Sequence, residues 1–247
     1  MRAYDEQCAR EFAQLAKGLQ QYFNDIAVTC PYGLPGQAIF HQALFAPLGD
    51  RAMELFLASG YRRNGNHLYC MRCPDCSACL PIRLAPSRVR LSRSQRRVLK
   101  RNRDVRIEFK PVEASQENIA LCDRFLASRY PQKNNNGRNY YQGFFSNMIT
   151  STIEIRYRAQ GRLIGTAIVD VGVNWMNAVY FFFDPDEARR SLGTLNILTM
   201  LDLCEQHEIR SLYLGYLIKE VPAMNYKKRF RPHELLQGDT WNVGGSK

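Results

Sequence analysis

The sequence predicts an α+β protein in which a cysteine-containing N-terminal part is followed by a mixed β-sheet with flanking helices. Three observations lead to this prediction: a cysteine cluster at residues 70–79, a strongly basic segment at 88–106, and alternating strand and helix patterns thereafter. With 247 residues, 45% of them hydrophobic, the chain can bury one large core or two modest ones. We expect the division at residue 105, which gives parts 1–105 and 106–247.

The first part is expected to contain helices separated by loops. Residues 4–23 carry apolar side chains at helical spacing, and residues 50–60 form a short helical pattern between an aspartate cap and a terminal glycine. The segment "CPYGLPGQ" between them is rich in proline and glycine and predicts a loop. Ser92 or Ser94 can begin a helix that carries the basic side chains of residues 88–106.

The second part combines strands and helices. The expected elements are a strand at 105–112, a helix at 117–130, a polar loop at 131–139, a three-stranded antiparallel meander within 151–186, a helix at 191–209 and a final strand at 211–219. A helix that begins at Ser191 and Gly193 has free N–H groups that can bind an anion, and glycine lets a phosphate come close. This order resembles the Gcn5-related acyltransferases. An ordinary N-cap at Ser191 is the alternative interpretation.

Positive charge is concentrated in one segment. The formal net charge is +11, and residues 88–106 alone carry nine Lys or Arg against one acid, a local charge of +8. Such a field favours a polyanion as partner, either nucleic acid or an anionic membrane surface. The segment lacks the apolar face that membrane attachment needs, which favours nucleic acid over a membrane. Repulsion within such one-sided charge favours binding to a polyanion over a merely solvated charged face. A second cluster, residues 226–231, interleaves four basic residues with two aromatic ones.

Hydropathy and cysteine content bear on the compartment. The densest apolar run, residues 178–183, has the length of a strand and is far from the roughly 20 residues of a membrane span. No signal-type apolar region follows the first residues. We therefore expect a soluble cytoplasmic protein without membrane partners. In a reducing cytosol its eight cysteines are expected to bind metal or do redox chemistry rather than form disulfides.

Four cysteines recur at every third position: Cys70, Cys73, Cys76 and Cys79. The spacing is close to an iron–sulfur run, but its last gap is two residues where three are usual, and one short run has little span for a tetrahedral zinc site. Cys30 can add a ligand from elsewhere in the chain. Zinc, an iron–sulfur cluster and free thiols in a tight turn all stay open. A cysteine nucleophile is less favoured because the histidines show no pairing pattern.

A pair of carboxylates follows the expected meander. Asp184 and Asp186 flank a proline at the end of the last strand. A carboxylate at this place can orient or deprotonate an amine. The same Asp-Pro-Asp sequence also forms a good turn, so both interpretations stand.

Taken together, several stretches resemble one family. These are "CPDCSACLPIR", "RSQRRVLKRNRD", "YFFFDPDEARRSLGTLNIL" and "LYLGYLIKEVPAMNYKKRFRPHELL". They are similar to the aminoacyl-tRNA–protein transferases of the N-degron pathway, in particular the bacterial aspartate/glutamate leucyltransferases. The resemblance runs from about residue 30 to 236 and implies a Gcn5-like catalytic half. It also implies transfer of leucine from leucyl-tRNA to the α-amino group of proteins beginning with Asp or Glu. The helix at 4–23 looks like an extension specific to this chain.

The resemblance assigns roles to individual residues. Asp184 is expected to orient or deprotonate the amine, and Arg83 and Tyr216 to contact the acceptor. The expected tRNA contacts are Arg93, Arg96, Arg97, Lys100, Arg101, Ser191, Gly193, Thr194, Lys227 and Lys228. The cysteines at family positions, and hence the expected metal ligands, are Cys30, Cys73, Cys76 and Cys79. The chemistry needs no cofactor, because the aminoacyl ester already stores the energy; the metal, zinc or iron–sulfur, would be structural.

Some positions depart from the family. Cys70 has no counterpart, and Gln37, Leu217 and Ala223 replace the usual residues, which leaves details of the substrate contacts open. Three alternatives remain: the same reaction with arginyl-tRNA, a zinc-stabilised RNA-binding module without catalysis, and an acetyltransferase that uses coenzyme A. Leucine would need an apolar pocket and arginine an acidic one. The sequence leaves the transferred amino acid, the general base and the oligomeric state open.

Overall fold

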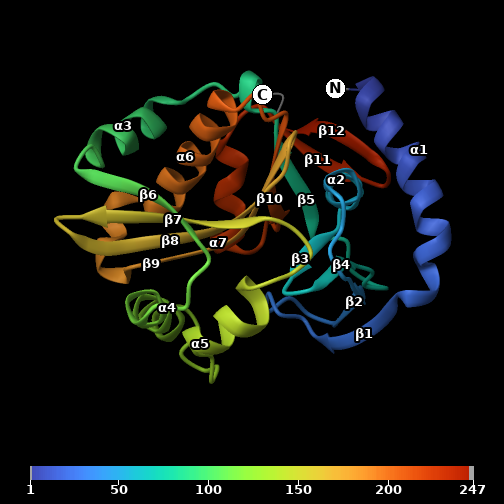
Figure 1. Ribbon diagram of the computed structural model, residues 1–247, viewed down its shortest axis with the longest axis horizontal. Helices are drawn as coiled ribbons and strands as arrows, with labels where there is room; N and C mark the ends of the chain where they lie inside the picture. Colours follow the sequence, from blue (N-terminus) through green and yellow to red (C-terminus); the bar gives the residue numbers. More distant parts are fainter. Residues whose placement is uncertain (1, 245–247) are drawn as a thin grey trace.

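Two β-sheets organise the chain in the computed structural model, which describes residues 2–244 (Figure 1). The smaller sheet is antiparallel with the order β1-β2-β4-β3. Its strands are β1 (Asn24–Thr29), β2 (Gln37–Leu44), β3 (Arg62–Asn64) and β4 (His67–Met71). Helices α1 (Arg2–Leu19) and α2 (Asp50–Ala58) pack on one another and on this sheet, close to where residues 4–23 and 50–60 predicted helices. The sequence analysis did not predict the four strands.

The larger sheet is mixed and has the order β12-β11-β5-β10-β9-β8-β7-β6. Its strands are β5 (Leu80–Leu84), β6 (Val105–Pro111), β7 (Thr152–Ala159), β8 (Arg162–Val171), β9 (Trp175–Phe183), β10 (Ser211–Leu217), β11 (His233–Gln237) and β12 (Thr240–Gly244). The predicted meander is confirmed as β7, β8 and β9. The prediction that residues 211–219 form the final strand is wrong, because the β11–β12 hairpin follows and pairs with β5.

Helices cover both faces of this sheet. The α-helices are α3 (Arg93–Arg101), α4 (Gln116–Arg129), α5 (Gly137–Tyr140), α6 (Leu192–Gln206) and α7 (Pro222–Asn225). The short 3-10 or π-helical turns are η1 (Gln20–Tyr22), η2 (Pro86–Arg88), η3 (Tyr141–Phe145), η4 (Pro185–Arg190) and η5 (Tyr226–Arg229). Figure 1 shows α3 and α6 on one side of the meander and α4 and α5 on the other.

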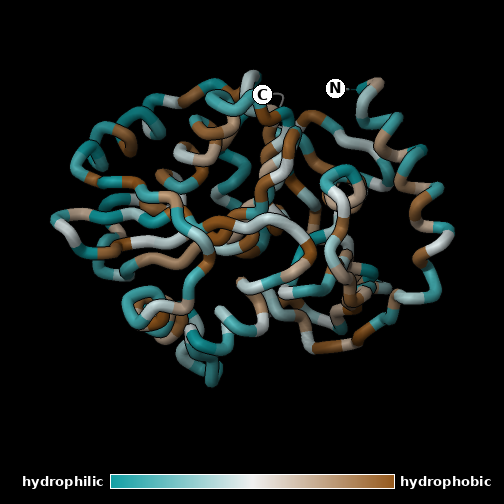
Figure 2. The backbone as a smooth tube through the Cα atoms, viewed as in Figure 1, coloured by the Kyte–Doolittle hydropathy of each residue, from teal (hydrophilic) through white to brown (hydrophobic). Residues whose placement is uncertain are grey.

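Because successive side chains of a strand point to opposite faces of the sheet, each face of the larger sheet has its own hydrophobic core. On one face Leu195 and Leu198 of α6 pack with Tyr157 of β7. On the other, Phe125 of α4 packs with Phe182 of β9. Figure 2 shows hydrophobic residues concentrated in the strands and α6, whereas α3 is mostly hydrophilic. The predicted α+β class, a cysteine-containing N-terminal part followed by a mixed sheet with flanking helices, is confirmed.

The two sheets are joined rather than separate. The change from one sheet to the other occurs between β4 and β5, and β5 lies inside the larger sheet. A fully buried ion pair, Arg63 with Asp170 at 2.9 Å, ties β3 to β8. The division into 1–105 and 106–247 therefore does not follow the sheets; as a statement about folding units it stays a prediction.

The parallel pair β9–β10 is short. It pairs only from Ser211 to Tyr213, opposite Trp175 to Asn177, after which both strands continue without a shared register. Gly215, with φ of 77°, lies in the irregular part of β10, where its pairing with β5 also shifts. Two strands that diverge in this way leave a gap in the middle of the sheet, and side chains from both faces surround it.

Candidate active site

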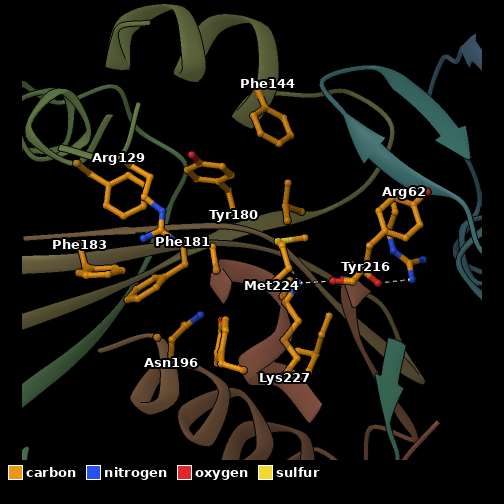
Figure 3. A pocket seen from close by; sticks show the side chains of 18 of the residues that line it. Arg62, Arg129, Phe144, Tyr180, Phe181, Phe183, Asn196, Tyr216, Met224 and Lys227 are labelled. Atoms are coloured by element: carbon orange, nitrogen blue, oxygen red, sulfur yellow. Dashed lines mark hydrogen bonds between the residues drawn. The ribbon is translucent and has the colours of Figure 1, made fainter. Parts of the chain in front are cut away.

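A cavity of about 670 Å³ lies where β9 and β10 separate (Figure 3). Its walls come from β9, β10, α4, α6, β3, η5 and the loop that follows β1. Parts of the chain that are more than 150 residues apart thus meet at one place. Five residues predicted to contact substrates are among those that line it: Ser191, Gly193, Thr194, Tyr216 and Lys227.

The cavity has an aromatic end, which Arg129 also borders, and a cationic end. Figure 3 shows Tyr180, Phe181 and Phe183 gathered at one end, and Arg62 and Lys227 near Tyr216 at the other. Among the described residues that line the cavity there is no aspartate or glutamate. The cavity therefore offers apolar surface and positive charge but no carboxylate that could pair with a cationic ligand.

The first turn of α6 opens onto the cavity. Ser191 has φ of 56°, and its side chain makes no capping hydrogen bond in the described structure, so it is not an ordinary N-cap. Within residues 2–244 no acceptor is found for the N–H groups of Leu192 and Gly193. A Cβ at Gly193 would be in van der Waals contact with Tyr226, 3.7 Å from its Oη, so the backbone of this turn lies close to that ring. The helix start can therefore donate hydrogen bonds to an anion, as the sequence predicts.

Lys227 and Lys228 have opposite environments. Lys228 is exposed, whereas Lys227 is buried and its Nζ donates to the carbonyl oxygen of Tyr216 at 2.9 Å. Burial, and then the charge of Arg62, lower the pKa of Lys227 to about 7. A large fraction of Lys227 is therefore a neutral amine at neutral pH, which can accept a proton.

Asp184 lies outside the set of described residues that line the cavity. Its buried carboxylate accepts from Arg124 and Arg162 at 2.5 Å each, and from the N–H of Asp186 at 3.1 Å. Both oxygens are thus occupied by cations and a turn. This geometry favours an anchoring role for Asp184; its predicted contact with the amine stays untested.

Arg83 is also remote from the cavity. The side chain is 1% exposed; Nε donates to Glu234 and Nη2 to Asp5, each at 2.8 Å. Its guanidinium lies 4.2 Å from the ring centroid of Trp241. Two carboxylates and an aromatic face already surround the Arg83 guanidinium, so the structure does not place it where it could bind the acceptor substrate.

Helix α3 presents the predicted basic surface. Ser92 begins it with a capping box that includes Gln95, and Gln95 and Val98 are buried. Five cations of this helix are exposed, and in the described part of the chain none of them forms an ion pair: Arg93, Arg96, Arg97, Lys100 and Arg101. Because α3 contacts α6, this uncompensated charge lies on the same side of the sheet as the anion-binding helix start.

Three other cysteine thiols lie near Cys79. Burial, and then neighbouring thiols, raise the pKa of Cys79 to about 12. Those thiols belong to Cys73, Cys30 and Cys76. Cys70 is different, because its thiol lies near Tyr61 and Arg72. Within residues 2–244 no group of three or more His, Cys, Asp or Glu side chains has metal-binding geometry, yet the four thiols form a donor set suited to zinc or an iron–sulfur cluster.

The sequence analysis missed four cationic residues that line the cavity, namely Arg62, Arg63, Arg129 and Lys133. Arg62 is buried at one end, and Arg129, at the end of α4, lies at the other beside the aromatic side chains (Figure 3). No local pattern marks either arginine.

A search of the described helices finds none that is long and apolar enough to cross a membrane.

A cavity between diverging strands, next to a helix start with free N–H groups and an exposed basic helix, is the arrangement expected of an acyltransferase whose donor is a polyanion. Two family models match the chain: "Arginine-tRNA-protein transferase, N terminus" over residues 28–97 and "Arginine-tRNA-protein transferase, C terminus" over residues 117–237. The chain belongs to this family and is an aminoacyl-tRNA–protein transferase.

Individual relatives support the same family assignment. The chain is 36% identical over 200 residues to an aspartate/glutamate leucyltransferase of Halorhodospira halophila, covering 79% of this chain and 85% of the relative. It is 38% identical over 188 residues to one of Stutzerimonas stutzeri, covering 74% and 78%. Among solved structures, L-PGS from Bacillus licheniformis superposes with a TM-score of 0.47 and 10% identity, covering 87% of this chain and 77% of that one.

Proposed function

We propose that this protein transfers leucine from leucyl-tRNA to the N-terminal α-amino group of proteins that begin with Asp or Glu, which marks them for the N-degron pathway. The similarity to aspartate/glutamate leucyltransferases supports this reaction. The absence of acidic residues from the described cavity lining is the observation that selects leucine over arginine. Because charged tRNA is its donor, we place the protein in the cytoplasm.

The reaction is aminolysis of an ester. The amine nitrogen attacks the ester carbonyl carbon, a peptide bond forms, and the bond between that carbon and the ribose oxygen breaks. The amine loses a proton, and the ribose oxygen gains one. No further energy source is needed. Positioning of the two substrates supplies much of the rate, and a base assists because an α-amine has an ordinary pKa near 8.

The residues divide this work as follows. The basic face of α3 holds the tRNA through its phosphates, and the start of α6 binds a phosphate near the 3′ end. The leucyl side chain lies among Phe125, Tyr180 and Phe183. Lys227 accepts the proton, in preference to Asp184, because Lys227 faces the cavity whereas Asp184 is already paired with two arginines.

Donor selection gives the first prediction. With an acidic peptide as acceptor, leucyl-tRNA is expected to be used at least about 100-fold better than arginyl-tRNA, because an unpaired guanidinium in this cavity would cost several kcal/mol. The measurement is transfer of a labelled amino acid from each charged tRNA to the peptide. Equal transfer of both amino acids would contradict the assignment of leucine. Binding of tRNA without transfer would instead support an RNA-binding module, and acetyl-CoA consumption an acetyltransferase.

We further propose that Cys30, Cys73, Cys76 and Cys79 hold one structural metal centre. The proposal is supported by the thiols of Cys30, Cys73 and Cys76, which lie near enough to raise the pKa of Cys79. A centre here would fix the loop that follows Cys30, whose Pro31 and Tyr32 line the cavity.

Serine variants at the first two cysteines of the cluster test this centre. Protein purified under reductant is expected to carry about one zinc ion or one iron–sulfur cluster per chain, and Cys73→Ser to lose it together with thermal stability. Cys70→Ser is the matched control and should keep the metal, because Cys70 lies near Tyr61 and Arg72 instead. Metal analysis and thermal melting measure both. Loss of metal in neither variant, or in both, would contradict this ligand set.

A further inference from the structure

Arg62 is a buried guanidinium without a carboxylate partner. The side chain is 4% exposed and lines the cationic end of the cavity, and among residues 2–244 no acid pairs with it. Burial lowers its pKa, but arginine stays charged at neutral pH. A buried, uncompensated charge is costly unless an anion arrives to pair with it.

The hydrogen bonds of Arg62 are incomplete. Nη1 donates to the carbonyl oxygen of Tyr61 at 2.6 Å and Nη2 to that of Gly215 at 2.9 Å. The buried Nε has no acceptor in the described structure. The next residue, Arg63, shows what a structural arginine looks like here, because its guanidinium is fully buried and binds both carboxylate oxygens of Asp170. Arg62 therefore keeps free N–H donors as well as its charge.

A second unpartnered polar group lies beside Arg62. The hydroxyl of Tyr216 is buried and has no hydrogen-bond partner in the described structure, and the Arg62 guanidinium lies 5.4 Å from the centroid of its ring. The carbonyl oxygen of the same Tyr216 accepts from Lys227 (Figure 3). One strand residue thus stands between a permanent cation and the amine that we assign as base.

We propose that Arg62 and the hydroxyl of Tyr216 bind the side-chain carboxylate of the acceptor's first residue. This inference rests on the proposed function and adds the residues that make the enzyme select an acidic N-terminus. A carboxylate accepts well from a guanidinium and a hydroxyl together. In aspartate and glutamate only a few bonds separate this carboxylate from the α-amine, so binding at Arg62 brings the amine toward Lys227.

The test compares peptides that begin with Asp and with Asn, which differ in charge and hardly in shape. Under saturating leucyl-tRNA, the wild-type protein is expected to prefer Asp over Asn by at least about 100-fold in kcat/KM, because an uncharged amide leaves the cation unpaired. In Arg62→Met that ratio should fall to within about tenfold of unity, mainly through a higher KM for the Asp peptide. Tyr216→Phe should lower the ratio by roughly tenfold, the worth of one hydrogen bond.

Controls separate the remaining outcomes. Leucyl-tRNA binding, measured by filter retention, should be unchanged in Arg62→Met; if binding is lost, Arg62 holds a tRNA phosphate and the inference is overturned. An unchanged Asp-to-Asn ratio in Arg62→Met also overturns it. If thermal melts show that Arg62→Met does not fold, Arg62→Lys takes its place. Lysine keeps the charge but loses the forked donors of the guanidinium, so Arg62→Lys must lower the Asp-to-Asn ratio of kcat/KM. Failure of the wild-type protein to transfer leucine to any peptide would instead reject the proposed function.

Discussion

Reversing four charges on α3, as Arg96→Glu, Arg97→Glu, Lys100→Glu and Arg101→Glu together, is expected to weaken tRNA binding by at least about 1000-fold. These side chains are exposed, and none forms an ion pair within the described residues, so their charge is available to phosphates. Each phosphate contact releases counterions, and reversal also adds repulsion. The slope of log affinity against log salt should fall by about three to four, because roughly 0.7 to 0.9 is lost per contact.

A matched variant on another surface controls for net charge. Arg2, Arg10 and Lys17 are exposed on α1, which Figure 1 shows on the opposite side of the molecule from α3. Reversing these three to Glu should change tRNA affinity less than about tenfold, through long-range charge only. Filter binding at several salt concentrations measures both variants. Wild-type affinity in the α3 variant would exclude this helix as the tRNA surface; helix content should persist, because the buried Gln95 and Val98 are untouched.

Local signals made part of the fold predictable from sequence. The capping box at Ser92, the apolar stripe of α6 and the alternating strands of the meander each lie within one short window. The smaller sheet gives no such signal, because β1 is exposed along its whole length and β3 has three residues. Strand β11 forms a local hairpin with β12, but its place in the sheet depends on pairing with β5, about 150 residues earlier, which no local pattern indicates.

Sequence alone can place residues at one location where a motif fixes the backbone, but not where the partners come from distant parts of the chain. Ser191, Gly193 and Thr194 meet at a helix start, which sequence alone defines. For Arg83, the deciding partner is Glu234 on β11, a strand the sequence analysis did not predict.

The role of Arg62 was not predictable from sequence for a different reason. Arg62 and Arg63 are adjacent in sequence and both line the cavity, and only strand register decides which one pairs with Asp170 and which one has no acidic partner. A pattern of residue types cannot distinguish two neighbours of the same type.

Replacing Lys227 with methionine is expected to lower kcat for leucyl transfer by about 100-fold to 10,000-fold, the usual contribution of a general base. The KM for leucyl-tRNA should change little, because α3 carries most of the phosphate contacts. Since burial and Arg62 lower the pKa of Lys227 to about 7, the wild-type rate should rise with pH as this amine loses its proton. The variant should keep only the rise due to the acceptor amine, near pH 8. Single-turnover rates across this pH range measure both.

The variant Lys227→Arg distinguishes two roles for Lys227. One is the general base proposed above, and the other is the tRNA contact that the sequence analysis predicted. Arginine keeps the charge and the donors but cannot become neutral, so Lys227→Arg should preserve tRNA affinity and still lose the rate. Recovery of the rate in Lys227→Arg would contradict the base.

The lower kcat expected for Lys227→Met would not result from unfolding of the variant. The amine has an ordinary pKa of 10.5 in the unfolded chain and about 7 in the folded one, so the unfolded state binds more protons between these values. Wild-type stability should therefore rise with pH across this window. Methionine removes that slope and leaves the fold at least as stable at pH 7, which denaturant titrations at several pH values can measure.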